Sequence, residues 1–210
     1  MSNAQELIEN QQNRRSYIEE IFEITGLKYN REEYWLRQST DSALLDAERL
    51  LPGDGVRVGL NTGAGGRWPT RLWPAASWRE LIRLLLQAGV QPVILGGPEE
   101  ESLNSNLARA TGARRPGAQP MDVFYALVQR CSCLVTSVTQ AMHLAIGARA
   151  PLVLFNNIFN RHEFELYDRG VVIEPPVPCD CFYSPVCRTG RDCINEISPS
   201  NRYSKLLCGF

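Results

Sequence analysis

The chain has 210 residues, of which 44% are apolar, and this is enough for one domain of ordinary size with an extension. Its 22 basic residues nearly balance its 23 acidic residues, so the molecule has no overall basic field of the kind that binds nucleic acid. No apolar run approaches the roughly 18 residues of a membrane-spanning helix, and the N-terminus is polar where a secretory signal would be apolar. These features exclude a disordered, fibrous or nucleic-acid-binding protein and predict a cytoplasmic one.

The first 55 residues have a polar, helix-like pattern. One apolar helix face is formed by Tyr17, Ile18, Ile21, Phe22 and Ile24, and a second by Leu44, Leu45, Leu50 and Leu51. Gly26 ends the first of these helices. Two short helices do not make a core of their own. We therefore predict that residues 1–55 are a helical extension or interdomain segment, which packs on the following domain or on another one.

Residues 56–210 follow a different pattern, in which short apolar strands alternate with helices. The predicted strands lie at 56–60, 92–95, 134–136 and 151–155, and the predicted helices at 78–87, 99–110, 121–130 and 140–146. Strands that are apolar on both faces and alternate with helices form a parallel sheet covered on both sides. The pattern predicts an α/β, Rossmann-like fold, which binds ligands in loops at the carboxyl ends of its strands.

The first of these loops is rich in glycine and arginine. It follows Thr62, and residues 63–71 read GAGGRWPTR. Glycines let backbone amides approach an oxyanion closely, and Arg67 and Arg71 can neutralise a diphosphate. The loop matches neither the Walker motif nor the dinucleotide-binding fingerprint. A glycine-rich turn with solvated arginines is the alternative interpretation.

Two further loops carry polar groups at the starts of helices. Glu99 and Glu100 follow a Gly-Gly-Pro turn, where the helix dipole favours acidic residues whatever the function, and either carboxylate can also accept hydrogen bonds from ribose hydroxyls. Thr139 can cap a helix whose first amides face a phosphate. His143 would lie one turn into that helix, where a structural histidine is the more common interpretation.

Three motifs occur in a recognisable order: NTGAGGRWPTRLWP at 61–74, GGPEE at 96–100 and TQAMHLA at 139–145. Together they resemble the C-terminal domain of the ADP-heptose:lipopolysaccharide heptosyltransferase family. The resemblance implies a GT-B architecture, in which two Rossmann-like domains face each other and the C-terminal one holds the nucleotide sugar. Residues 56–210 would be that nucleotide-sugar-binding domain, with a cysteine-rich tail.

The resemblance also implies roles for individual residues. It places Arg71 on the donor diphosphate and one of Glu99 and Glu100 near the ribose. It places Thr139 and His143 beside the phosphates. The implied donor-binding set is Thr62, Gly63, Arg67, Arg71, Glu99, Glu100, Thr139, Gln140 and His143. Transfer would require no cofactor, and no catalytic residue is assigned, because the base that activates the acceptor commonly comes from the N-terminal domain.

Two departures from the family pattern bear on activity. The family usually has Asp-Thr-Gly where this chain has Val138, Thr139 and Gln140, so the acidic side chain expected near the donor sugar is absent. An acceptor-binding domain should also precede this one, and only its last helices fit in residues 5–51. The predicted function is transfer of a heptose-like sugar from a nucleotide donor, which is ADP-activated in this family, to a lipopolysaccharide-type glycan or lipid-linked acceptor. The reaction would take place at the inner face of the inner membrane. It would need the missing domain or a partner subunit. The alternative is a non-catalytic or truncated nucleotide-sugar-binding or scaffold protein.

The tail contains a cluster of cysteines, Cys179, Cys181, Cys187 and Cys193. Four thiolates can close a tetrahedral structural zinc site, although the spacing is not that of the usual Cys-x-x-Cys pairs. Free or partly buried thiols are the alternative. A third hypothesis for the whole chain, a zinc-stabilised interaction module, rests on these cysteines and the N-terminal helices.

Overall fold

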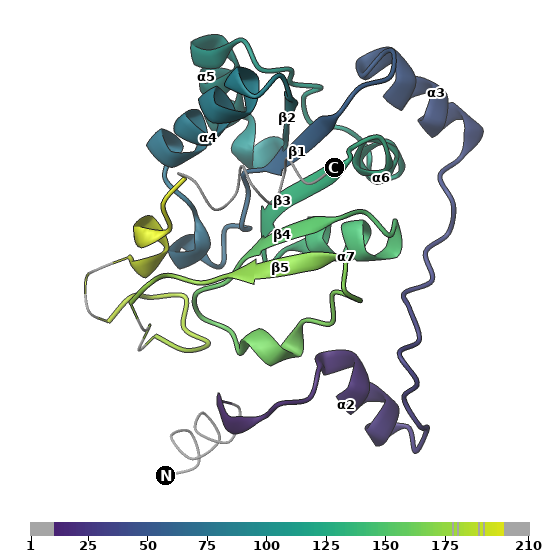
Figure 1. Ribbon diagram of the computed structural model, residues 1–210, viewed down its shortest axis with the longest axis vertical. Coiled ribbons are helices and arrows are strands. Elements are labelled where there is room, and N and C mark those ends of the chain that lie inside the picture. Colours follow the sequence, from purple (N-terminus) through teal and green to yellow (C-terminus); the bar gives the residue numbers. More distant parts are fainter. Residues whose placement is uncertain (1–10, 178, 180, 189, 191, 200–210) are drawn as a thin grey trace.

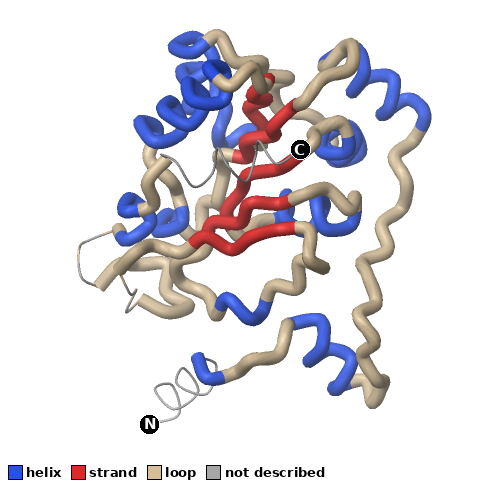
Figure 2. The backbone as a smooth tube through the Cα atoms, viewed as in Figure 1, coloured by secondary structure: helices blue, strands red, loops and turns tan. Residues whose placement is uncertain are grey.

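The computed structural model describes residues 11–177, 179, 181–188, 190 and 192–199. Within this part of the chain, a parallel sheet of five strands forms the centre, in the order β2-β1-β3-β4-β5 (Figures 1 and 2). Its strands are β1 (Arg57–Asn61), β2 (Gln91–Leu95), β3 (Cys133–Ser137), β4 (Leu152–Phe155) and β5 (Gly170–Ile173). The predicted Rossmann-like α/β fold is confirmed, and the unpredicted strand β5 extends the sheet at its edge.

Helices cover both faces of the sheet. One face carries α4 (Ala75–Gln87) and α5 (Glu101–Thr111), and the other carries α3 (Asp41–Leu50), α6 (Met121–Gln129) and α7 (Gln140–Gly147) (Figure 1). Strand side chains alternate between the two layers. In β2, Val93 packs in the core under α6 and α7, whereas Ile94 packs in the core under α4. This is why each strand is apolar on both faces in the sequence.

The two N-terminal helices differ in how they pack. Helix α3 begins at its N-cap Thr40, whose hydroxyl accepts a hydrogen bond from the amide of Ala43, and it buries Ala43 and Ala47 in the core beside α6. Helix α2 (Tyr17–Ile24) buries no residue and leaves Ile24 84% exposed. An extended segment joins the two helices along the edge of the domain (Figure 2). The structure therefore makes α3 part of the domain's core, whereas α2 lies outside it.

The cysteine-rich tail folds back against the α4 face of the sheet. Ile194 and Ile197 pack in that core, and the indole of Trp73 donates a hydrogen bond of 3.0 Å to the carbonyl of Ile197. Among the described residues, which include the four tail cysteines, no group of three or more His, Cys, Asp or Glu side chains is placed to hold a metal ion. The predicted zinc site is therefore not supported. No described helix is long and apolar enough to cross a membrane.

Candidate functional site

A cavity of about 490 Å³ lies at the carboxyl ends of β1, β2 and β3. The chain runs from β1 outward to β2 in one direction and returns to β3 on the other side of β1, so this is the point where the strand order reverses. Ligands of open parallel sheets bind at such points, and the volume suits a nucleotide-sized molecule. The cavity is lined by Asn61, Gly63, Ala64, Gly65, Trp68, Arg71, Gly96, Gly97, Pro98, Glu99, Glu100, Gln119, Met121, Phe124, Thr139, Gln140 and Ala141.

Arg71 is the dominant charge in this cavity. Its side chain is only 7% exposed, and its guanidinium lies 5.5 Å from the ring centre of Trp68 and 5.4 Å from that of Phe159. The guanidinium donates hydrogen bonds to the backbone carbonyls of Ala64 and Val138, while its buried Nε has no hydrogen-bond partner. None of the described carboxylates forms an ion pair with it.

The missing counter-ion has an electrostatic consequence. Burial lowers the pKa of Arg71 to about 10, so the side chain is still a cation at neutral pH. A buried cation without an anionic partner is costly, and an anion that enters the cavity would remove part of that cost. The site therefore favours a phosphate or another strong anion.

The two glutamates of the second loop have different roles. Oε2 of Glu100 accepts a hydrogen bond of 2.8 Å from the amide of Gly97, and a Cβ atom on Gly63 would lie 2.5 Å from Oε1 of Glu100. Glu100 thus joins the first and second loops, and a side chain at position 63 would displace its carboxylate. Glu99 is exposed and forms no hydrogen bond or ion pair with a described residue. Of the two carboxylates, Glu99 is the one available to a ligand.

Helix α7 points its amino end at the cavity. Thr139 occupies the N-cap position, but its hydroxyl does not cap the helix. It instead lies 3.0 Å from the hydroxyl of Thr136 and accepts a hydrogen bond from the side-chain amide of Asn61. The first amides of α7, at Gln140 and Ala141, are left without a side-chain cap, and a helix N-terminus with open amides attracts anions.

Three of the predicted residues do not line the cavity. The hydroxyl of Thr62 is buried in a hydrogen bond of 2.6 Å to Asn104 of α5. Arg67 is exposed and lies over the Trp68 ring. His143 lies one turn into α7, where its Nδ1 is 3.2 Å from the hydroxyl of Tyr34 and burial lowers its pKa. The remaining predicted residues line the cavity, namely Gly63, Arg71, Glu99, Glu100, Thr139 and Gln140.

Several residues of the site were not predicted from the sequence. Phe159, which covers the Arg71 guanidinium, comes from the loop after β4, and no pattern pairs it with Arg71. Met121 and Phe124 come from the first turn of α6, and Gln119 precedes that helix. Asn61 had a signal, because it is a polar residue at the end of an apolar strand.

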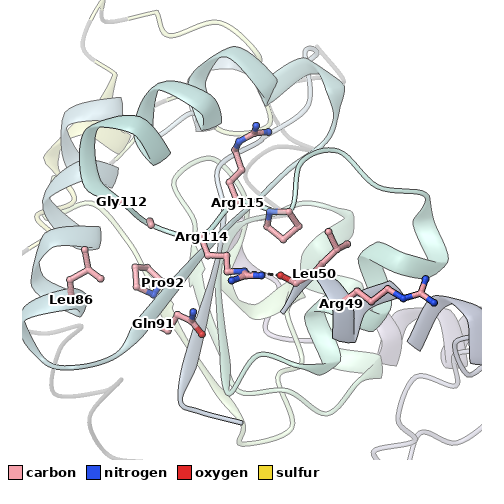
Figure 3. A pocket seen from close by; sticks show the side chains of 10 residues that line it. Arg49, Leu50, Leu86, Gln91, Pro92, Gly112, Arg114 and Arg115 are labelled. Carbon is pink, nitrogen blue, oxygen red and sulfur yellow. Dashed lines mark hydrogen bonds between the residues drawn. The ribbon is translucent and has the colours of Figure 1, made fainter. Parts of the chain in front are cut away.

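A second cavity, of about 510 Å³, lies at the opposite end of the strands, beside the first residue of β2 (Figure 3). It contains three arginines, but each has a structural partner. Arg114 donates a hydrogen bond of 2.7 Å to the carbonyl of Leu50, at the end of α3, and Arg49 and Arg115 form ion pairs with Asp46 and Glu101. These arginines neutralise helix ends and carboxylates, so the cavity around Arg71 is the better candidate.

Comparisons with known proteins agree with this assignment of the fold. Residues 19–162 match the family model of glycosyltransferase family 9 (heptosyltransferase). The fold is similar to that of a family 9 glycosyl transferase from Veillonella parvula, with a TM-score of 0.65 and 18% identity over 78% of this chain and 50% of that one. It is also similar to ADP-heptose lps heptosyltransferase II of E. coli, with a TM-score of 0.62 and 18% identity over 85% of this chain and 53% of that one.

A third solved structure, the E. coli heptosyltransferase WaaC with ADP-2-deoxy-2-fluoro heptose, has a TM-score of 0.50 and 22% identity over 62% of this chain and 41% of that one. No curated protein sequence matches the chain. The chain spans about half the length of the first two of these solved structures, and its Rossmann-like domain corresponds to one half of a GT-B glycosyltransferase. Because the family model covers more than half of the chain, the chain belongs to glycosyltransferase family 9, the heptosyltransferase family.

Proposed function

We propose that this domain binds the nucleotide-sugar donor of a heptosyltransferase-like reaction. The donor would be a heptose-like sugar on ADP, and the acceptor a glycan of lipopolysaccharide type, carried on a lipid at the inner face of the inner membrane. The observation that carries the proposal is Arg71, a buried cation without a carboxylate partner among the described residues, in the cavity at the reversal of strand order.

The diphosphate of the donor would lie between Arg71 and the amino end of α7. There it accepts hydrogen bonds from the guanidinium and from the amides of Gln140 and Ala141. When the bond to the sugar breaks, negative charge grows on the departing diphosphate, and the same donors stabilise that charge more strongly than they stabilise the intact donor. The chain's contribution to catalysis would be this electrostatic stabilisation.

The nucleoside would occupy the part of the cavity beside α6. Met121 and Phe124 offer apolar surface to a base, and Gln119 offers a carboxamide that can both donate and accept hydrogen bonds. The free carboxylate of Glu99, on the opposite loop, would accept hydrogen bonds from the ribose hydroxyls.

Transfer itself would need a second half that binds the acceptor. The acceptor hydroxyl must be held against the anomeric carbon and lose its proton to a base. At the position where the family usually has an aspartate, Val138 packs against the apolar core, and its carbonyl oxygen accepts a hydrogen bond from Arg71. We therefore assign donor binding to this domain, and acceptor binding and the base to a preceding domain or a partner subunit.

The test is a calorimetric titration of the chain with ADP, using UDP and GDP as controls, in wild type and two variants. Arg71→Ala should weaken ADP binding by about one to two orders of magnitude, which is the loss of charge-assisted hydrogen bonds. Arg114→Ala, which removes an arginine from the other cavity, is the matched control and should leave the affinity unchanged. Binding that survives the loss of Arg71, or that is lost equally with Arg114, would contradict the proposal.

A further inference from the structure

Residues 31–39 form an extended strap between α2 and α3 that is fixed to the domain along its length. Glu33 is held most firmly, by two hydrogen bonds of 3.0 Å from Arg169 and an ion pair of 2.9 Å with Arg149. The hydroxyl of Tyr167 donates a hydrogen bond of 2.6 Å to the carbonyl of Glu32. The backbone on the N-terminal side of Tyr34 is therefore held in one place.

Tyr34 meets His143 face to face. The two rings stack with their centres 5.7 Å apart and their planes 15° from parallel, and the Tyr34 hydroxyl lies 3.2 Å from Nδ1 of His143. On the C-terminal side, Leu36 lies so close to Gly147 of α7 that a side chain at Gly147 would collide with it. Tyr34 thus stands between two fixed points of the strap, in contact with one imidazole.

The hydrogen bond between these residues selects one form of the imidazole. A phenol is a good donor and a weak acceptor, because its oxygen lone pair is delocalised into the ring, whereas an unprotonated ring nitrogen of histidine is a good acceptor. Tyr34 therefore donates to Nδ1, and the proton of the neutral imidazole stays on Nε2. Nε2 takes part in none of the hydrogen bonds among the described residues, so it is a free N–H donor.

The position of His143 on α7 directs this donor toward the cavity. Side chains on a helix lean toward its N-terminus, so a residue covers the surface near the residues three and four positions before it. For His143 these residues are Gln140 and Thr139, and both line the cavity around Arg71. A diphosphate at the amino end of α7 would come within reach of the Nε2 proton.

We propose that Tyr34 is a positioning residue, which holds His143 as the Nε2–H tautomer and aims that proton at the phosphates of the donor. This proposal rests on the proposed function, because it takes a nucleotide diphosphate as the ligand. It also assigns a role to the segment outside the Rossmann-like core: the strap completes the donor site through one side chain.

Nitrogen NMR of the imidazole rings tests the tautomer without any ligand. The chain has only two histidines, so His162→Gln leaves the signal of His143 alone. The His162→Gln variant should show one tautomer of His143, with the proton on Nε2. Adding Tyr34→Phe to this variant should give a mixture of both tautomers. Tyr17→Phe is the matched control, because Tyr17 lies in the same N-terminal segment and its hydroxyl makes no hydrogen bond to a described residue. A proton on Nδ1, or a signal that Tyr34→Phe leaves unchanged, would overturn the assignment.

A double-mutant cycle on ADP affinity tests the link to the donor. Tyr34→Phe should weaken ADP binding roughly two- to tenfold in the wild-type background, the effect of one net hydrogen bond, and should have no effect in the His143→Ala background. Equal effects of Tyr34→Phe in both backgrounds would show that Tyr34 does not act through His143. If the wild-type chain binds no ADP, the donor site fails and this role fails with it, and the NMR result then shows separately whether Tyr34 sets the tautomer.

Discussion

Replacing Arg71 by methionine separates the effect of this side chain on ligand affinity from its effect on stability, because methionine fills most of the same volume without the charge. If Arg71 is kept for an anionic ligand, the variant should lose ligand affinity while its stability changes little. If Arg71 is a structural residue, the variant should instead lose stability. The two explanations therefore predict opposite patterns in the same protein.

The expected change in stability can be worked out from the surroundings of Arg71. Burial lowers its pKa to about 10, which sets an upper limit of about 3 kcal/mol on the cost of holding the charged form, and solvent in the cavity reduces this to about 1–2 kcal/mol. Removing the guanidinium relieves that cost but leaves the carbonyls of Ala64 and Val138 without a donor, at about 1 kcal/mol each. The opposing effects nearly cancel, so the free energy of unfolding should change by no more than about 1 kcal/mol.

Ligand affinity should respond much more strongly. Loss of charge-assisted hydrogen bonds to a diphosphate costs about 1.5–3 kcal/mol, which is roughly 10- to 150-fold in the dissociation constant for ADP. Urea unfolding measures the first quantity, and calorimetric titration with ADP measures the second. A variant destabilised by more than about 3 kcal/mol that still binds ADP normally would show that Arg71 is a structural residue, because such a loss is typical of a broken structural charge network.

Three further variants test other parts of the structure. Gly63→Ala places a Cβ atom 2.5 Å from Oε1 of Glu100 and should displace that carboxylate from the Gly97 amide. The variant should be less stable by about 1–2 kcal/mol in thermal unfolding. This loss should nearly disappear in a Glu100→Ala background. Burial, together with the carboxylate of Glu20, raises the pKa of Glu163 from 4.5 to about 7. The folded state therefore holds this proton more tightly than the unfolded chain, and the free energy of unfolding of wild type should fall as the pH rises from 4.5 to about 7. Glu163→Gln should lack this fall and be about 1–2 kcal/mol more stable than wild type at pH 8. Parallel pH profiles of the two proteins would contradict this. Gly147→Ala should push Leu36 and the strap off α7, so that trypsin cleaves after Arg37 faster than in wild type; an unchanged rate would show that the strap adapts.

Much of the fold could be predicted from the sequence, because its pattern is set by burial. Apolar runs such as those that became β1 and β2 lie in a sheet covered on both faces, and the helices between them follow from the parallel pairing. Strand β5 was not predicted, because Gly170 to Ile173 is short and only partly buried, and the loop before it contains only a short 3₁₀ helix, Arg161–Glu163, in place of an α-helix. The N-terminal helices could not be told apart by periodicity, since both have an apolar face, yet only α3 has residues in the core.

The site was predictable only where local chemistry indicates function. The glycine-rich loop and Arg71 follow a strand, and both line the cavity, as Rossmann-like topology requires. That Arg71 has no counter-ion could not be predicted, because it depends on which carboxylates the fold brings near it. For the same reason the contact between Tyr34 and His143, which are 109 positions apart, has no signal in the sequence. The zinc prediction used the spacing of the cysteines, and the fold does bring all four to one small cavity, but among the described residues no three of them are placed to hold a metal ion.

We propose that an adenine nucleotide binds where the strand order reverses, with its phosphates between Arg71 and the amino end of α7. The most direct measurement is an NMR titration of the nitrogen-labelled chain with ADP, in which backbone amide signals are followed residue by residue. We expect the largest changes at Gly65, Gln140 and Ala141. Changes centred instead on Gly112 and Arg114, beside the cavity at the amino end of β2, or no changes at any ADP concentration, would contradict this binding site.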